Sequence, residues 1–407
     1  MKAKVLSYFC GAATFALLVL AISPAAWAVT ETRIHTFNSA VDPTGLVADS
    51  AGNLYGTTDS GGFYNSGTVF QVRPSPGGIW TESTIYSFTG GSDGAGPEAV
   101  LTLDAQGNLY GTTQVGGGGS CGCGTVFELS RSTGGEWTET TLHSFAGGAD
   151  GSNPRYTNLV FDAVGNLYGV TEFGGSAGEG TVFELSPQEG GGWTESVLYE
   201  FAGGASDGAN PLGGLVFDTA GNLYGSAESG GSSNCGGGCG GVFELSPEAG
   251  GGWKEQMLYF FQGSNDGYSP DSLLIIDSAG NLYGMTQFGG SLFCGTVFKL
   301  SRAAGGAWSK ETLHLFTGEP DGCGPFLNMV RNAGYFYGVT ESGGASDNGA
   351  IFEINPAGVE QVFFSFPGGN GGFEPRSLIL NSTRRAFFGV TFGLGFPSNA
   401  VLFEISN

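Results

Sequence analysis

Five loops of this chain each place one aspartate among glycines, and carboxylates repeated in this way could bind a cation or the hydroxyl groups of a glycan. The loops read GGSDGAGP, GGADGSNP, GGASDGANP, GSNDGYSP and GEPDGCGP, and their aspartates are Asp93, Asp150, Asp207, Asp266 and Asp321. An Asp-Gly turn explains the same residues with fewer assumptions. Ligand binding by these aspartates is the functional hypothesis that we retain beside it. Calcium is the one cofactor that such a ring would suit, and we expect no other.

Histidine, the most frequent general base in enzymes, occurs only three times in this chain. The three histidines occupy one place in a repeated segment, and tyrosine fills that place elsewhere. The histidines are His35, His143 and His314, and the tyrosines are Tyr86, Tyr199 and Tyr259. Exchange with tyrosine is typical of a packing residue, and no nucleophile elbow, Walker or Rossmann glycine pattern occurs. We assign no catalytic residue, although carboxylates of separate repeats could pair as in a glycosidase, for example Glu172, Glu228 or Glu341.

Six cysteines follow residue 28, an even number that is typical of disulfides in an exported protein. Cys294 and Cys323 fall in loops expected on one face of adjacent repeats, so they form the preferred pair. Cys235 and Cys239 could close a local loop. The other two cysteines are separated by one residue, a spacing that strains a disulfide. No histidine lies near these loops in the sequence, so no metal ligand is assigned.

All these residues are carried by a phrase that repeats along the chain. NLYG occurs five times and degrades to YFYG and AFFG, which makes seven copies in steps of 51 to 59 residues. A period of about 50 residues indicates a propeller or an array. After residue 28 no helical periodicity stands out, so the chain is predicted to be all-β.

Each copy offers four strand-like runs separated by turn residues. In the fourth copy they span residues 214–218, 222–227, 241–246 and 253–261. The turn between the first two runs reads DSAGN or a close variant, and we interpret its aspartate as a turn former. The third run, GTVFEL, is apolar on both faces, as in a sheet covered on both sides. The fourth run begins with tryptophan in five copies, which favours packing between repeats over a sugar-binding platform.

The two ends of the chain carry complementary fragments of the repeat. Residues 31–37 resemble only the fourth run and precede the first complete copy, whereas the seventh copy ends with a third run at residues 401–406. Pairing these fragments would close a ring without a free edge. The predicted fold is therefore an all-β, seven-bladed β-propeller with four strands per blade. It forms a single domain over residues 29–407, with residues 31–37 as the outer strand of blade 7.

The phrase GNLYG-x-T-x-x-GG followed by GTVFEL resembles the GloVer tandem repeat of exported "choice-of-anchor" proteins. Five copies keep NLYG and four keep GTVF, at Gly67, Gly124, Gly180 and Gly295, and the match extends over essentially all of residues 29–407. The resemblance implies export and a tandem-repeat body, and it carries no catalytic activity. No anchor segment follows Asn407 in this sequence, which departs from what the family name implies and leaves the mode of surface attachment open.

The first 28 residues have the layout of a secretory signal peptide, with Lys2 and Lys4, an apolar stretch over residues 5–22, and small residues up to Ala28. Its removal leaves 12 basic and 37 acidic residues, a net charge of about −25. Such a charge repels phosphate backbones and anionic lipids, so we expect neither nucleic-acid binding nor membrane insertion. We predict a monomer that is secreted, periplasmic or located at the cell surface.

In a propeller whose first run is innermost, the loops after the second and fourth runs emerge on one face. We predict that this face binds an extracellular glycan or protein and that the chain is a binding scaffold without enzymatic activity. The alternative is a secreted glycan-cleaving hydrolase or lyase on the same scaffold. A cleft with two carboxyl groups ~5 to 10 Å apart would favour that alternative.

Overall fold

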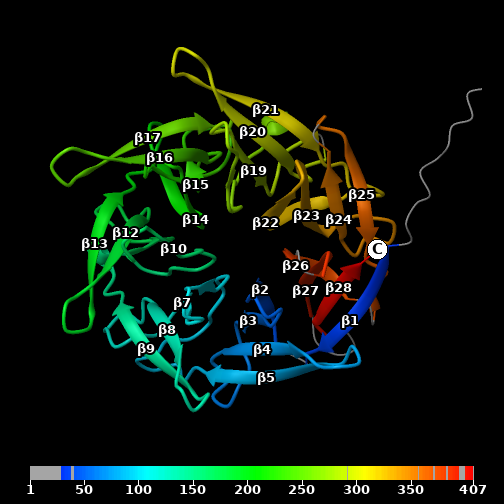
Figure 1. Cartoon of the computed structure of the whole chain (residues 1–407). Coiled ribbons are helices and arrows are strands. Elements are labelled where there is room, and N and C mark those ends of the chain that lie inside the picture. The colour runs from blue at the N-terminus through cyan, green and yellow to red at the C-terminus, as the bar shows by residue number, and fades with distance from the viewer. Residues whose placement is uncertain are drawn as a thin grey trace, which may run out of the picture.

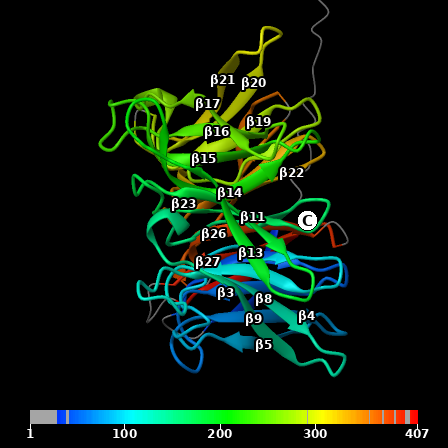
Figure 2. The ribbon, with the colours of Figure 1, turned by 90° about the vertical axis from the view of Figure 1, so that its left-hand side faces the viewer.

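The computed structural model describes residues 29–37, 41–290, 292–355, 357–369, 372–381, 384–393 and 399–406. The predicted signal peptide, residues 1–28, lies outside them. Seven four-stranded antiparallel sheets stand around a common axis (Figure 1), and Figure 2 shows the ring edge-on with loops on both faces. The predicted all-β, seven-bladed propeller is confirmed. No helix among the described residues is long and apolar enough to span a membrane.

The blades are numbered in chain order, and their strands run from the axis outwards. Blade 1 has β2 (Pro43–Ala48), β3 (Leu54–Thr58), β4 (Thr68–Pro74) and β5 (Trp80–Ser87). Blade 2 has β6 (Thr102–Leu103), β7 (Leu109–Thr113), β8 (Thr125–Arg131) and β9 (Trp137–Ser144). Blade 3 has β10 (Val160–Phe161), β11 (Leu167–Thr171), β12 (Thr181–Pro187) and β13 (Trp193–Glu200). Blade 4 has β14 (Gly208–Phe217), β15 (Leu223–Gly230), β16 (Gly241–Pro247) and β17 (Trp253–Phe260).

Blade 5 has β18 (Ile275–Ile276), β19 (Leu282–Thr286), β20 (Thr296–Arg302) and β21 (Trp308–Leu315). Blade 6 has β22 (Cys323–Asn332), β23 (Tyr335–Ser342), β24 (Ala350–Ile354) and β25 (Glu360–Ser365). Blade 7 has β26 (Phe373–Asn381), β27 (Ala386–Phe392), β28 (Val401–Ser406) and, as its outer strand, β1 (Thr30–Thr36). Two short 3-10 helices, η1 (Gly148–Asp150) and η2 (Ser264–Asp266), lie in loops between blades.

The ring closes through its two ends. β1 pairs antiparallel with β28, and Arg33 lies opposite Phe403 (Figure 1). Phe37, just after β1, packs edge-to-face on Phe70 of blade 1, with their ring centroids 5.0 Å apart. Closure by the N-terminal strand is therefore confirmed, and it buries an edge that would otherwise be open to another strand.

The same aromatic contact joins every pair of neighbouring blades. A phenylalanine that follows the outer strand of one blade meets a phenylalanine of the third strand of the next, with centroids 5.0 to 5.2 Å apart. The ring on the third strand also covers the glycine of the Tyr-Gly or Phe-Gly pair. A Cβ on Gly225, for example, would lie 2.4 Å from Cζ of Phe243. The glycine is thus needed for the close approach of this ring.

The predicted roles of the outer-strand tryptophans and the turn aspartates are also confirmed. Trp253 of blade 4 packs edge-to-face on Tyr168 of blade 3, at 6.1 Å between centroids. In the turn before β3, Asp49 accepts hydrogen bonds from the backbone N–H groups of Ala51 (3.0 Å) and Asn53 (2.9 Å). Both devices recur around the ring, so the repeat encodes the packing of blades rather than a binding platform.

Candidate functional site

One face of the ring carries the loops after the second and the outer strands of each blade. The two kinds of loop pair with each other through isolated bridges such as Ala95 with Val115 and Ser152 with Phe173. A disulfide between Cys294 and Cys323 links them between blades 5 and 6. This face therefore carries the two kinds of loop that the order of the strands predicts. Each loop after an outer strand ends at a proline at the start of the next blade.

Two positions of the repeat on this face vary between blades, although the residue before each one is constant: a proline before the first, and a threonine or alanine before the second. The residue after the proline is, from blade 1 to blade 7, Thr44, Glu98, Arg155, Leu212, Asp271, Phe326 and Arg376. The second position is the third residue after the Tyr-Gly or Phe-Gly pair, directly after a threonine or alanine. From blade 1 to blade 7 it is Asp59, Gln114, Glu172, Glu228, Gln287, Glu341 and Phe392. Variable residues that follow constant ones on a rigid scaffold are typical of a recognition surface.

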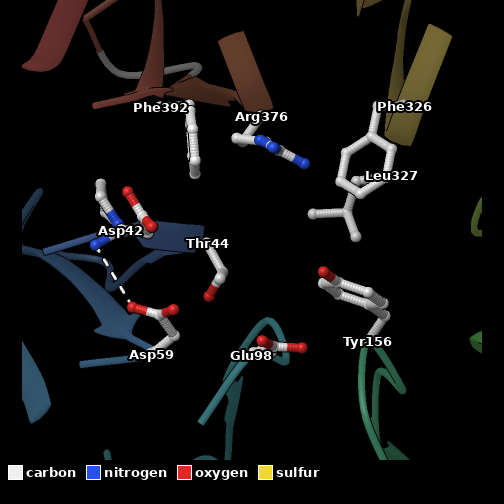
Figure 3. A pocket seen from close by; sticks show the side chains of 10 residues that line it. Asp42, Thr44, Asp59, Glu98, Tyr156, Phe326, Leu327, Arg376 and Phe392 are labelled. Carbon is white, nitrogen blue, oxygen red and sulfur yellow. Dashed lines mark hydrogen bonds between the residues drawn. The ribbon is translucent and has the colours of Figure 1, made fainter. Parts of the chain in front are cut away.

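Six of these fourteen residues line a cavity of about 120 Å³ on this face, near the axis of the ring (Figure 3). We call this cavity the mouth. Its lining residues are Asp42, Pro43, Thr44, Asp59, Glu98, Tyr156, Phe326, Leu327, Arg376 and Phe392. They come from blades 1, 2, 3, 6 and 7, so the mouth exists only in the closed ring.

An aromatic contact across the axis forms one wall of the mouth. Tyr156 of blade 3 meets Phe326 of blade 6 edge-to-face, with 5.8 Å between their centroids. Blades 3 and 6 are not neighbours in the ring, so this contact spans its centre. The mouth therefore lies to one side of the axis, beside blades 7, 1 and 2 (Figure 3).

Arg376 supplies positive charge to the mouth. Its guanidinium lies 4.9 Å from the ring centroid of Phe326 and 4.7 Å from that of Phe392, and it forms an ion pair of 3.1 Å with Glu341. Two aromatic faces and a carboxylate hold this side chain in one orientation. A second pair joins Arg155 Nε to Glu172 Oε2 at 2.8 Å.

Carboxyl groups outnumber the two arginines around the mouth. They are Asp42, Asp59, Glu98, Glu172, Glu228, Asp271, Glu341 and Glu374, and their charges influence one another or the arginines. Burial raises the pKa of Glu98, with a smaller contribution from Asp59, and it raises the pKa of Asp271 well above its usual range. One buried oxygen each of Asp42, Glu98 and Asp271 has no hydrogen-bond partner among the described residues. The mouth therefore has unused acceptors that suit a donor-rich ligand.

The five aspartates predicted to bind a ligand lie away from the mouth, in the loops that follow the outer strands. Asp93 accepts from the backbone N–H of Thr89 (2.8 Å) and the hydroxyl of Tyr86 (3.0 Å). Asp207, Asp266 and Asp321 each accept from a backbone N–H group four or five residues before them and contact the tyrosine or histidine of the preceding strand. Asp150 does the same with Ala146 and His143. The turn role is thus present in all five, and ligand binding by them stays a prediction.

The other residues singled out in the sequence are distributed between the mouth and the rim. Glu172 and Glu341 lie at the mouth through their ion pairs, and Glu228 is near enough to Glu172 for its charge to act on it. The three histidines lie on the outer strands. Disulfides join Cys294 to Cys323 and Cys235 to Cys239, and a third joins Cys121 to Cys123.

Sequence reasoning missed Tyr156, Phe326, Arg376 and Phe392. For Phe326, Arg376 and Phe392 a signal was available, because an alignment of the seven copies shows variable residues directly after constant ones. The sequence does not show that these side chains point toward the axis, nor that blade 3 contacts blade 6 through Tyr156 and Phe326.

The fold resembles that of several solved proteins. Virginiamycin B lyase from Staphylococcus aureus is 11% identical, with a TM-score of 0.56 over 93% of this chain and 99% of that one. An ancestral GH74 enzyme is 12% identical, with a TM-score of 0.58 over 91% of this chain and 48% of that one. At such identities the likeness shows the fold alone. No curated protein matches the sequence significantly. The model of the Gloeobacter/Verrucomicrobia repeat matches twice, over residues 19–238 and 196–403, and the chain therefore belongs to the Gloeobacter/Verrucomicrobia repeat family.

Proposed function

We propose that this chain is an exported, non-enzymatic binding scaffold whose mouth takes the end of a glycan. The observation that carries the proposal is the variation of the repeat at the positions around the axis, where acidic, aromatic and basic side chains converge. A ligand-binding face is the part of a rigid repeat scaffold that is free to vary.

The chemistry of the mouth favours a ligand rich in hydroxyl or amine donors. Asp42 and Glu98 offer buried acceptor oxygens, and Tyr156 and Phe392 offer aromatic surface for the apolar face of a sugar ring. The excess of carboxylates disfavours anionic sugars. The cavity of about 120 Å³ is small for a whole ligand, so it suits a terminal unit whose remainder lies across the loops.

A glycan array tests this function. The wild-type chain should bind glycans with neutral or amino-sugar ends and should not bind those with acidic ends. Glu98→Gln and Tyr156→Ala should each lower the affinity at least tenfold, which corresponds to about 1.4 kcal/mol. Glu189→Gln, in an exposed turn on the opposite face, should leave it unchanged. Absence of glycan binding, or binding that the two mouth variants do not alter, would contradict the proposal.

The alternative function is a glycan-cleaving enzyme at the same mouth. It is favoured by one feature: Glu98 is a partly buried carboxyl group with a raised pKa beside the carboxylate of Asp59, as in an acid and base pair. Release of reducing sugar from a polysaccharide panel, lost in Glu98→Gln and Asp59→Asn, would support this alternative. Binding without turnover would support the scaffold.

A further inference from the structure

A small polar cluster recurs at the rim of the ring, where two neighbouring blades meet. We call it a junction site. It combines the tyrosine or histidine of one outer strand, the aspartate of the following loop, and a residue from the outer strand of the next blade. Two junction sites have the composition His-Asp-Glu. They are His143, Asp150 and Glu195 between β9 and β13, and His314, Asp321 and Glu360 between β21 and β25 (Figure 1).

The spacing of these side chains matches that of metal ligands. His143 Nε2 lies 3.0 Å from Asp150 Oδ1, and His314 Nε2 lies 3.1 Å from Asp321 Oδ2 and 4.0 Å from Glu360 Oε2. In both sites the three ligand atoms lie within 4.8 Å of one another. Zinc bound at about 2.0 to 2.2 Å in a tetrahedral site holds its ligand atoms roughly 3.4 Å apart. Small side-chain movements would therefore suffice to complete the coordination.

Each site also contains a buried carboxylate oxygen without a partner. Oε1 of Glu195 and Oε1 of Glu360 are inaccessible to solvent and accept no hydrogen bond from the described residues. The side chain of Glu360 is 11% exposed. These carboxyl groups therefore need either a proton or a cation.

The chain supplies such a cation itself at another junction. Between blades 4 and 5 the place of the glutamate is taken by Lys310, whose side chain is 3% exposed. Its Nζ lies 2.9 Å from Asp266 Oδ1 and also donates to the hydroxyl of Thr312 at 2.9 Å. A positive charge thus fits beside the loop aspartate, and the His-Asp-Glu junctions lack that built-in charge.

The tyrosine junctions show what removes a metal ligand. At the junction of blades 3 and 4, the hydroxyl of Tyr199 donates to Asp207 at 3.0 Å. Burial raises the pKa of Tyr199, so its phenol stays protonated and is no ligand at neutral pH. Among the described residues, a nitrogen donor joins two carboxylates only where histidine replaces tyrosine. Such a set neutralises a divalent ion and suits zinc better than calcium.

From this geometry we propose that the junction sites of His143 and His314 each bind one divalent transition-metal ion of the zinc class. Each ion would join two neighbouring blades through three side chains and leave a fourth position for water. The two sites are independent of the mouth and of its ligand.

Equilibrium dialysis of the untagged full-length chain tests this proposal. The protein is stripped with a chelator and dialysed against micromolar Zn²⁺ with millimolar Ca²⁺ present to occupy weak surface carboxylates. The wild type should retain two zinc ions per chain. His143→Tyr and His314→Tyr should each retain one, and the double variant should retain none. His35→Tyr is the matched control and should retain two, because the sequence has serine, not aspartate, at the corresponding place four residues before Pro43.

Tyrosine is the residue that the repeat itself uses at this place, so these variants should fold, which near-UV circular dichroism checks. If a tyrosine variant fails to fold, Asp150→Asn and Glu360→Gln serve instead and should each remove one zinc ion. The proposal is overturned if the wild type retains no zinc, or if the double variant retains as much as the wild type.

Discussion

The glycine of the Tyr-Gly pair in blade 4 offers a sharp test of how the repeat packs. Replacing Gly225 by alanine would place Cβ 2.4 Å from Cζ of Phe243 and 3.0 Å from Cδ2 of Leu215. Carbon atoms in contact are normally about 3.5 to 4.0 Å apart. The ring must therefore move by about 1 Å, but it is fully buried and packs on Phe201 at 5.1 Å between centroids.

Overpacking of this kind costs about 1 to 3 kcal/mol, and the lower entropy of the unfolded alanine chain offsets about 0.4 to 1 kcal/mol. We expect Gly225→Ala to lower the free energy of unfolding by about 2 kcal/mol in urea denaturation. Gly305→Ala is the control, because its Cβ would meet no atom within 4 Å. It should change stability by less than 0.5 kcal/mol or raise it slightly.

A second substitution locates the cause of the loss. Phe243→Leu removes the outer atoms of the ring and leaves a cavity, so alone it also destabilises the chain. Combined with Gly225→Ala, the new methyl group enters that cavity, and the double variant should be more stable than the sum of the single effects by about 1 kcal/mol. Additive effects, or a Gly225→Ala variant as stable as the control, would refute the packing explanation.

Three further predictions concern the covalent, electrostatic and topological supports of the ring. Replacing Cys294 and Cys323 by serine should lower the free energy of unfolding, measured by urea denaturation, by about 3.5 kcal/mol. The same change at Cys235 and Cys239 should lower it by only about 2 kcal/mol, because that disulfide closes a shorter loop. Burial and the charge of Asp207 raise the pKa of Glu255 from 4.5 to about 7, so the stabilisation by its proton is complete below pH 4.5 and lost as pH rises to about 7. Glu255→Gln should therefore flatten the melting temperature between these pH values, whereas Glu248→Gln, in an exposed turn, should follow the wild type. Deleting residues 29–37 should lower both melting temperature and solubility, and the corresponding peptide added in trans should restore them; an unchanged melting temperature would contradict closure by β1.

The fold could be predicted from the sequence because the repeat records contacts that every blade makes. Each Tyr-Gly or Phe-Gly pair needs a phenylalanine on the next strand, and five outer strands begin with a tryptophan, such as Trp253, which packs on the preceding blade. The closure was visible as an unmatched fragment at either end. These features are local or periodic, so one chain contains several independent copies of the same signal.

The mouth could not be predicted in the same way, because its residues are the ones that do not repeat. Tyr156 and Phe326 meet only because blades 3 and 6 point across the axis, a relation with no periodic signature. The loop aspartates, in contrast, were predicted as ligand-binding residues because they do repeat. Asp93 and its counterparts recur because each one stabilises the same turn, as its bonds to backbone N–H groups show.

Joining β1 to β28 also sets an order of events during synthesis on the ribosome. β1 is made before the other strands of the ring and has to wait for β28, so blade 7 is assembled only after the strands of all seven blades have been made. Until then the earlier blades form an open arc with two unpaired borders, the condition in which β-rich chains associate with one another. A polypeptide released before β28 is made would remain an open arc, because β1 would have no strand of blade 7 to pair with.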